Sequence, residues 1–151
     1  MDKKILIMGL PGSGKTTLAA ALAPMLGAVH WNADAVRANV NKDLGFSEDD
    51  RIEQARRMGW LCDQVVAAGC WAIADFVCPT HETRAAFGDC VRIWVDTIEE
   101  SIFADTNQMF VAPLHCDYRV LTQSAQSWAS EIYHGLMVME TGGNVPPVLY
   151  R

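Results

Sequence analysis

A glycine-rich motif of eight residues constrains the fold of this chain more than any other sequence feature. Residues 9–16 read GLPGSGKT and match the pattern G-x-x-x-x-G-K-[ST] at every fixed position. An apolar run at residues 5–8 precedes the motif, and a stretch rich in alanine and leucine follows it to residue 26. This context predicts a buried strand, a turn and a helix. Glycines in such a turn let backbone N–H groups converge on phosphate oxygens, and the helix N-terminus adds partial positive charge.

The motif therefore predicts a binding site for a nucleoside triphosphate, with ATP and Mg²⁺ as the expected cofactors. Lys15 is expected to reach the β- and γ-phosphates, and the Thr16 hydroxyl is expected to bind Mg²⁺. Arg119 lies near the last expected strand, where kinases with this motif often contact adenine; the alternative is an ordinary surface arginine. The predicted nucleotide-binding residues are Gly9, Pro11, Gly12, Ser13, Gly14, Lys15, Thr16, Thr17 and Arg119.

Length and composition indicate one domain spanning residues 1–151. Hydrophobic residues make up 50% of the chain and charged residues 20%, which supplies one core and excludes a disordered tail or a coiled coil. No apolar run approaches the roughly 18 residues of a membrane span, so no membrane partner is expected. The five cysteines are scattered, as in a cytoplasmic protein with reduced thiols. A net charge of −6 disfavours general binding to nucleic acid.

Apolar runs alternate with amphipathic stretches, a pattern typical of βαβ units and a mainly parallel sheet. Ser47 is the expected N-cap of a long helix because three acidic residues follow it, and Gly69 is expected to end that helix. Together with the motif, the pattern predicts an α/β P-loop NTPase three-layer sandwich with a mainly parallel five-stranded sheet. The expected strands are 5–8, 28–31, 71–77, 91–95 and 118–121, and the other helices are 14–26, 35–39 and 125–139; an irregular tail follows from residue 142.

Two carboxylates are candidates for chemistry near the acceptor. Asp34 follows the second expected strand, and Asp75 lies towards the end of the third. Both strand ends open onto the crevice beside the glycine-rich motif in a parallel α/β sheet. Asp34 is the candidate general base, with a helix N-cap as the alternative. Asp75 is the candidate partner of Mg²⁺ or of the acceptor, with a strand-end carboxylate bonded to a loop as the alternative.

Two arginines, Arg37 and Arg51, flank the short segment after the Asp34 strand. Guanidinium groups in this position are suited to an anionic acceptor, because they pair with carboxylate, sulfate or phosphate oxygens in two-pronged geometry. The alternative is a solvated helix face, which is the better interpretation for Arg56.

The motif combines with further segments that resemble adenylylsulfate kinases. These are residues 32–37 (NADAVR), 43–47 (DLGFS) and 50–57 (DRIEQARR), and the likeness continues through Cys78-Pro79 and Arg84. The resemblance implies a P-loop kinase fold, MgATP as the donor, and phosphorylation of a hydroxyl group on a nucleotide-like acceptor. By the same resemblance, Asp34 and Lys15 are catalytic and Phe46 stacks on the acceptor base. The implied substrate-binding residues are Arg37, Phe46, Arg51, Gln54, Asp75, Phe76, Cys78 and Pro79, with Thr16 and Asp75 at the metal.

Three departures from the family pattern affect the acceptor side. Asn32 replaces an acidic residue of the family's D-G-D stretch, and Gln54 replaces an asparagine beside the adenylylsulfate. The R-D-x-K-G lid motif is absent, and residues 104–113 read ADTNQMFVAP in its place. Lid cations stabilise the transferring charge, so their loss indicates an altered acceptor site beside an intact donor site.

This asymmetry leads to three functional hypotheses. The leading one is a kinase of 5-hydroxymethyluracil in phage DNA, as part of base hypermodification in the host cytoplasm, with the base flipped out or single-stranded. The alternative is an authentic adenylylsulfate kinase that makes 3′-phosphoadenylylsulfate. The third is a non-catalytic nucleotide-binding module, which has no need of Asp34. Assembly as a homodimer is left open.

Overall fold

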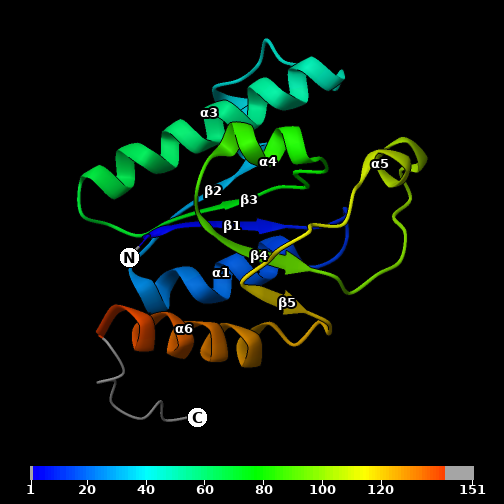
Figure 1. Ribbon diagram of the computed structural model, residues 1–151. Helices are drawn as coiled ribbons and strands as arrows, with labels where there is room; N and C mark the ends of the chain where they lie inside the picture. The colour runs from blue at the N-terminus through cyan, green and yellow to red at the C-terminus, as the bar shows by residue number, and fades with distance from the viewer. Residues whose placement is uncertain (1, 142–151) are drawn as a thin grey trace.

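The computed structural model describes residues 2–141 and contains one five-stranded sheet between two layers of helices (Figure 1). All strand pairs are parallel, and the order across the sheet is β2-β3-β1-β4-β5. This arrangement confirms the predicted α/β three-layer architecture. The strands are β1 (Lys4–Met8), β2 (Val29–Asn32), β3 (Ala72–Asp75), β4 (Val91–Val95) and β5 (Tyr118–Val120).

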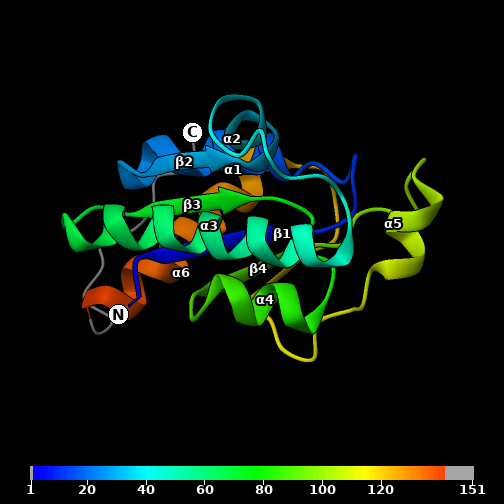
Figure 2. The same cartoon turned by 90° about the horizontal axis from the view of Figure 1, so that it is seen from above.

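Helices cover both faces of the sheet and one stands apart from it. One face carries α1 (Lys15–Leu26) and α6 (Ala125–Thr141), and the opposite face carries α2 (Ala33–Asn39), α3 (Glu48–Ala67) and α4 (His81–Phe87). The short helix α5 (Ala104–Met109) lies beyond the end of the sheet towards which the strand arrows point (Figure 2).

The central strand β1 joins the two halves of the core. Ile5 and Ile7 pack with α1 and α6, whereas Leu6 and Met8 pack with α3 and α4 on the other face. Every residue of β1 is buried. A parallel strand covered on both faces reads as a continuous apolar run, which is why this strand is predictable from sequence.

The structure differs from the sequence prediction at short elements and at strand ends. Neither α4 nor α5 is predicted, because seven and six residues are too few to establish a helical period. The third strand ends at Asp75 rather than 77, because the chain leaves the sheet and turns at Cys78, whose φ is 47°. The second strand lies one residue later than expected. The predicted N-cap at Ser47 is confirmed, since its side chain accepts a hydrogen bond from the Asp50 N–H.

No helix among residues 2–141 is long and apolar enough to cross a membrane. The predicted irregular tail from residue 142 lies outside the described residues, and the single domain 1–151 and the cytoplasmic location stay predictions.

Gly59 allows α3 and α4 to approach closely. A Cβ atom at this position would lie 2.2 Å from the carbonyl oxygen of Phe87, a backbone atom that cannot move away cheaply. Gly59→Ala is therefore expected to lower the free energy of unfolding by about 1–3 kcal/mol, as overpacked substitutions do. Alanine has the higher helix propensity by about 1 kcal/mol, so without the clash the variant would be more stable. Denaturant unfolding of the wild type and the variant measures the sign of the change in the free energy of unfolding.

Candidate active site

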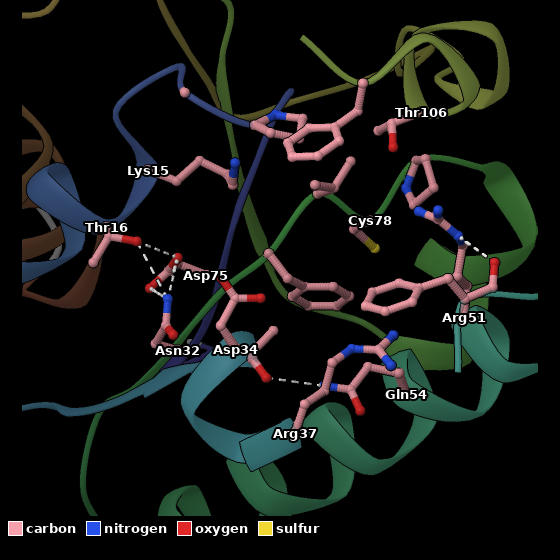
Figure 3. A pocket seen from close by; sticks show the side chains of 18 of the residues that line it. Lys15, Thr16, Asn32, Asp34, Arg37, Arg51, Gln54, Asp75, Cys78 and Thr106 are labelled. Carbon is pink, nitrogen blue, oxygen red and sulfur yellow. Dashed lines mark hydrogen bonds between the residues drawn. The ribbon is translucent and has the colours of Figure 1, made fainter. Parts of the chain in front are cut away.

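An open pocket of about 560 Å³ lies at the carboxyl ends of the strands (Figure 3). Five segments line it: the glycine-rich loop with the start of α1, the β2–α2 junction, the α2–α3 loop with the start of α3, the loop after β3, and α5 with the residue before it. Parallel strands place their following loops at the same edge of a sheet, so this edge is where an α/β protein builds a ligand site.

The glycine-rich loop runs from β1 into α1 with its predicted geometry. Gly12 and Gly14 have positive φ angles of 82° and 105°, which favour glycine. Gly9 is required for a second reason, because a Cβ there would lie 2.4 Å from the Val95 carbonyl oxygen of β4. The Thr97 hydroxyl donates a 2.6 Å hydrogen bond to the Ser13 carbonyl and so fixes the loop from the β4 side.

Lys15 is the largely buried cation of this loop. Its Nζ donates a 2.9 Å hydrogen bond to the Leu10 carbonyl oxygen. Burial lowers the pKa of Lys15 to about 8, although the carboxylates of Asp75 and Asp34 act in the opposite direction. A desolvated ammonium group facing the pocket is suited to a phosphate oxygen, whose charge would restore the stability of the protonated form.

A polar cluster surrounds Asp75, which is buried. Thr16 Oγ1 donates to Asp75 Oδ1 at 2.9 Å, and Asn32 Nδ2 donates to the same oxygen at 3.2 Å. Asn32 also contacts Thr16 Oγ1 at 3.3 Å, and His30 Nε2 contacts Asp75 Oδ2. The cluster forms because β2 and β3 pair in register with Asn32 opposite Asp75. Asp75 is therefore bonded to three side chains from α1 and β2, not to a loop.

This cluster fits a magnesium ion held together with phosphates. Mg²⁺ is usually bound by one or two carboxylates, with water and substrate phosphates completing its coordination. Thr16 and Asp75 supply one hydroxyl and one carboxylate beside the glycine-rich loop. Residues 2–141 contain no group of three acidic, histidine or cysteine side chains that could hold a metal ion.

Asp34 lies in the pocket as the second residue of α2, and its side chain is exposed. The alternative interpretation of Asp34 as a helix N-cap is wrong, because Asn32 occupies that position and accepts from the Ala35 N–H at 3.0 Å. Burial lowers the pKa of both Lys15 and Arg37, and the Asp34 carboxylate opposes this lowering at each of the two cations. It therefore stands between the donor side and the acceptor side of the pocket (Figure 3).

Arg37, Arg51 and Phe46 form the opposite wall. The Arg37 guanidinium lies 4.4 Å from the centre of the Phe46 ring, and that of Arg51 lies 5.7 Å from it. Arg37 donates to the Gly45 carbonyl at 2.7 Å, and Arg51 donates to the Phe46 carbonyl at 3.0 Å. Burial and the neighbouring Arg51 lower the pKa of Arg37. Two cations at an exposed aromatic ring provide a surface for an anion attached to a planar base.

The remaining predicted substrate residues line the same pocket, and they differ in whether their side chains are already hydrogen-bonded within the protein. Phe76, Cys78 and Pro79 lie on the loop after β3, and burial raises the pKa of the Cys78 thiol to about 12. Both polar atoms of the Gln54 side chain are hydrogen-bonded within the protein. Its Oε1 accepts from Asn41 at 2.7 Å, and its Nε2 donates to the Ala33 carbonyl at 3.4 Å. Its side chain therefore shapes the wall.

Arg119 and Thr17 lie outside the main pocket. Arg119 pairs with Asp96 at 2.6 Å and lies 4.7 Å from the Trp94 ring, on the β5 side of the sheet. Thr17 lines a smaller hollow of about 120 Å³ between α1 and the ends of β4 and β5. Contact of Arg119 with adenine stays a prediction.

Sequence reasoning misses several residues of the site, and four of them illustrate the reason. His30 contacts Asp75, and α5 with its preceding residue adds Phe103, Asp105 and Thr106 to the lining. No local pattern marks them. His30 is brought to Asp75 by strand pairing, and the other three by a six-residue helix without a readable period.

Comparison with known proteins identifies the family. The family model for adenylylsulphate kinase matches residues 1–126. The chain belongs to the adenylylsulfate kinase family. The family resemblance read from the sequence is therefore confirmed, whereas the phage DNA kinase branch has no support from the comparisons.

Curated adenylyl-sulfate kinases are similar to part of this chain. The enzyme of Gloeothece citriformis is 35% identical over 101 residues, which are 61% of this chain and 57% of that protein. The enzyme of Shewanella pealeana is 44% identical over 81 residues, or 50% of this chain and 40% of that protein. The chain thus spans about half the length of the curated relatives it matches.

Solved adenylylsulfate kinase structures share the fold. The Mycobacterium tuberculosis APS kinase CysC in complex with AMPPNP and APS superposes with a TM-score of 0.81 at 24% identity, covering 90% of this chain and 98% of that one. A hexameric APS kinase from Thiobacillus denitrificans gives a TM-score of 0.72 at 25% identity, covering 95% of this chain and 29% of that one. These likenesses support the P-loop kinase fold.

Proposed function

We propose that this protein is an ATP-dependent kinase that transfers the γ-phosphate of ATP to a hydroxyl group of adenylylsulfate, giving 3′-phosphoadenylylsulfate. One observation carries the proposal. A single pocket joins the phosphate-binding residues Lys15 and Thr16 to the Arg37–Phe46–Arg51 wall, with Asp34 exposed between them. Membership of the adenylylsulfate kinase family supports the same acceptor.

The donor side binds and orients the triphosphate. Backbone N–H groups of the glycine-rich loop cradle the phosphates, and the Lys15 ammonium neutralises the β- and γ-oxygens. Thr16 and Asp75 would hold Mg²⁺, with Asn32 and His30 fixing the orientation of the Asp75 carboxylate. When bound, Mg²⁺ supplies positive charge that offsets the charge developing on the transferring phosphoryl group.

The acceptor side presents the hydroxyl group. Phe46 offers its ring to the planar base, and Arg37 and Arg51 bind the anionic group attached to it. Asp34 accepts the proton of the hydroxyl group as the γ-phosphoryl transfers in line. Its position in the pocket suits this role, since Asp34 lies between Lys15 on the donor side and Arg37 on the acceptor side.

Hydroxymethyluracil in DNA is the second candidate acceptor. The observation in its favour is that α5 and the residue before it bring Asp105 and Phe103 to the pocket, and neither of these residues is a cation. The relatives named above are adenylyl-sulfate kinases, so the comparisons favour adenylylsulfate instead.

A coupled assay of ADP formation decides between the acceptors. Adenylylsulfate, single-stranded DNA containing 5-hydroxymethyluracil, and a blank without acceptor are measured in parallel with MgATP. We expect ADP formation above the blank with adenylylsulfate only. ADP formation with the DNA alone would show that the acceptor is DNA rather than adenylylsulfate. If the protein binds ATP but neither acceptor increases ADP formation, the proposed activity is contradicted.

A further inference from the structure

The segment between β4 and β5 places a carboxylate on the acceptor side of the pocket. Asp105 of α5 lies with its Oδ2 3.5 Å from Nη2 of Arg51, and both residues line the pocket. The Arg51 side chain is 12% exposed, whereas the Asp105 side chain is 74% exposed. The arginine is thus fixed in the wall, and the carboxylate approaches it from the solvent side.

The backbone around α5 holds this carboxylate in place. The Asn107 amide donates to the Ser101 carbonyl at 2.8 Å and accepts from the Ser101 N–H at 2.8 Å, which closes the turn before the helix. After the helix, the Val111 N–H donates to the Pro79 carbonyl at 2.7 Å, and the buried Arg84 donates to the Val111 carbonyl. The C-terminal side of α5 is therefore tied to the loop after β3 and to α4, and its N-terminal side is bonded to its own preceding turn, by bonds that do not involve Asp105.

Among residues 2–141, the Arg51–Asp105 contact is the only ion pair that joins α5 to α3. Figure 2 shows α5 standing apart from α3 and α4. The pair is long and exposed at the Asp105 end, and such pairs are weak and readily exchanged for another partner. An anion that reaches Arg51 must compete with Asp105 for the same guanidinium.

We propose that Asp105 determines the charge selectivity of the acceptor site, by pairing with Arg51 and opposing acceptors whose negative charge must reach Arg51. The identity of the acceptor rests on the proposed function. The charge effect does not, because it concerns any nucleotide anion bound against Phe46 and Arg51. Asp34 and Asp75 also face the pocket, but Lys15 and Arg37 lie beside Asp34, which leaves Asp105 as the carboxylate opposed to Arg51.

Two variants of Asp105 change the charge stepwise. Asp105→Asn is expected to lower the KM for adenylylsulfate about two- to fivefold, the effect of a typical exposed ion pair. Asp105→Lys reverses the charge and is expected to lower the KM for adenylylsulfate further, to about tenfold below the wild-type value. The KM for ATP is expected to stay unchanged in both Asp105 variants. Glu100→Gln is the matched control, because Glu100 is exposed in the same connection and loses the same charge without contacting Arg51.

An equilibrium measurement separates this inference from the proposed function. The dissociation constant of adenosine 5′-monophosphate is measured by calorimetry with ADP saturating the donor site, for the wild type and all three variants. Stepwise tightening in Asp105→Asn and Asp105→Lys, absent in Glu100→Gln, supports the inference even if adenylylsulfate is not phosphorylated. Unchanged binding in the Asp105 variants, or equal tightening in Glu100→Gln, overturns it even if adenylylsulfate is a good acceptor.

Discussion

Asp34→Asn is expected to lower kcat about 10²- to 10⁴-fold, the usual contribution of a positioned general base. Asparagine keeps the size of the side chain but cannot accept the proton of the acceptor hydroxyl group. Asp34 is exposed at the start of α2 and is not its N-cap, so the substitution leaves the helix and the pocket walls intact. ATP affinity is expected to stay at the wild-type value or to increase, because a carboxylate near Lys15 is removed.

Steady-state kinetics and ATP titration on the same preparations test this assignment. Asp89→Asn is the matched control, since Asp89 is an exposed carboxylate outside the pocket and its loss should change neither quantity. An Asp34→Asn protein with wild-type kcat would show that another group takes the proton. Equal losses of kcat and ATP affinity would assign Asp34 to nucleotide binding instead.

Lys15→Met is expected to lower kcat about 10²- to 10³-fold and to weaken ATP binding as well, because it removes a preorganised charge at the transferring phosphate. The side chain is largely buried and bonds to the Leu10 carbonyl, so methionine fills a similar volume but leaves that oxygen without its donor. Loss of both binding and turnover distinguishes Lys15 from Asp34, for which only turnover falls.

Lys42→Met supplies the comparison for Lys15, since Lys42 is exposed and outside the pocket. ATP dissociation constants and single-turnover rates are measured for both variants, with thermal unfolding to verify that each is folded. A folded Lys15→Met protein that binds ATP and turns over as the wild type does would contradict the nucleotide site at this loop.

The parts of the structure that are predictable from sequence depend on local signals. The glycine-rich motif between an apolar run and a helix places β1, the loop and α1 in their observed positions. The acidic first turn after Ser47 likewise marks the start of α3. In each case the residues that produce the signal are adjacent in the chain.

The parts that are not predictable depend on contacts between distant segments. His30 becomes part of the Asp75 cluster only through the pairing of β2 with β3. Asn32 reads as a lost acidic residue, whereas in the structure it caps α2 and donates to Asp75. Asp105 reaches Arg51 because the connection between β4 and β5 brings α5 to the same pocket, which no sequence period indicates.

The most direct test of the proposed activity follows the transferred group itself. Wild-type protein is incubated with Mg²⁺, ATP labelled in the γ-phosphate and adenylylsulfate, and the products are separated by chromatography. We predict label in a product with the properties of 3′-phosphoadenylylsulfate, and at least about 100-fold less label when Asp34→Asn replaces the wild type for the same time. Label that stays in ATP, or that leaves only as inorganic phosphate, would contradict the claim that this pocket transfers phosphate to an acceptor hydroxyl group.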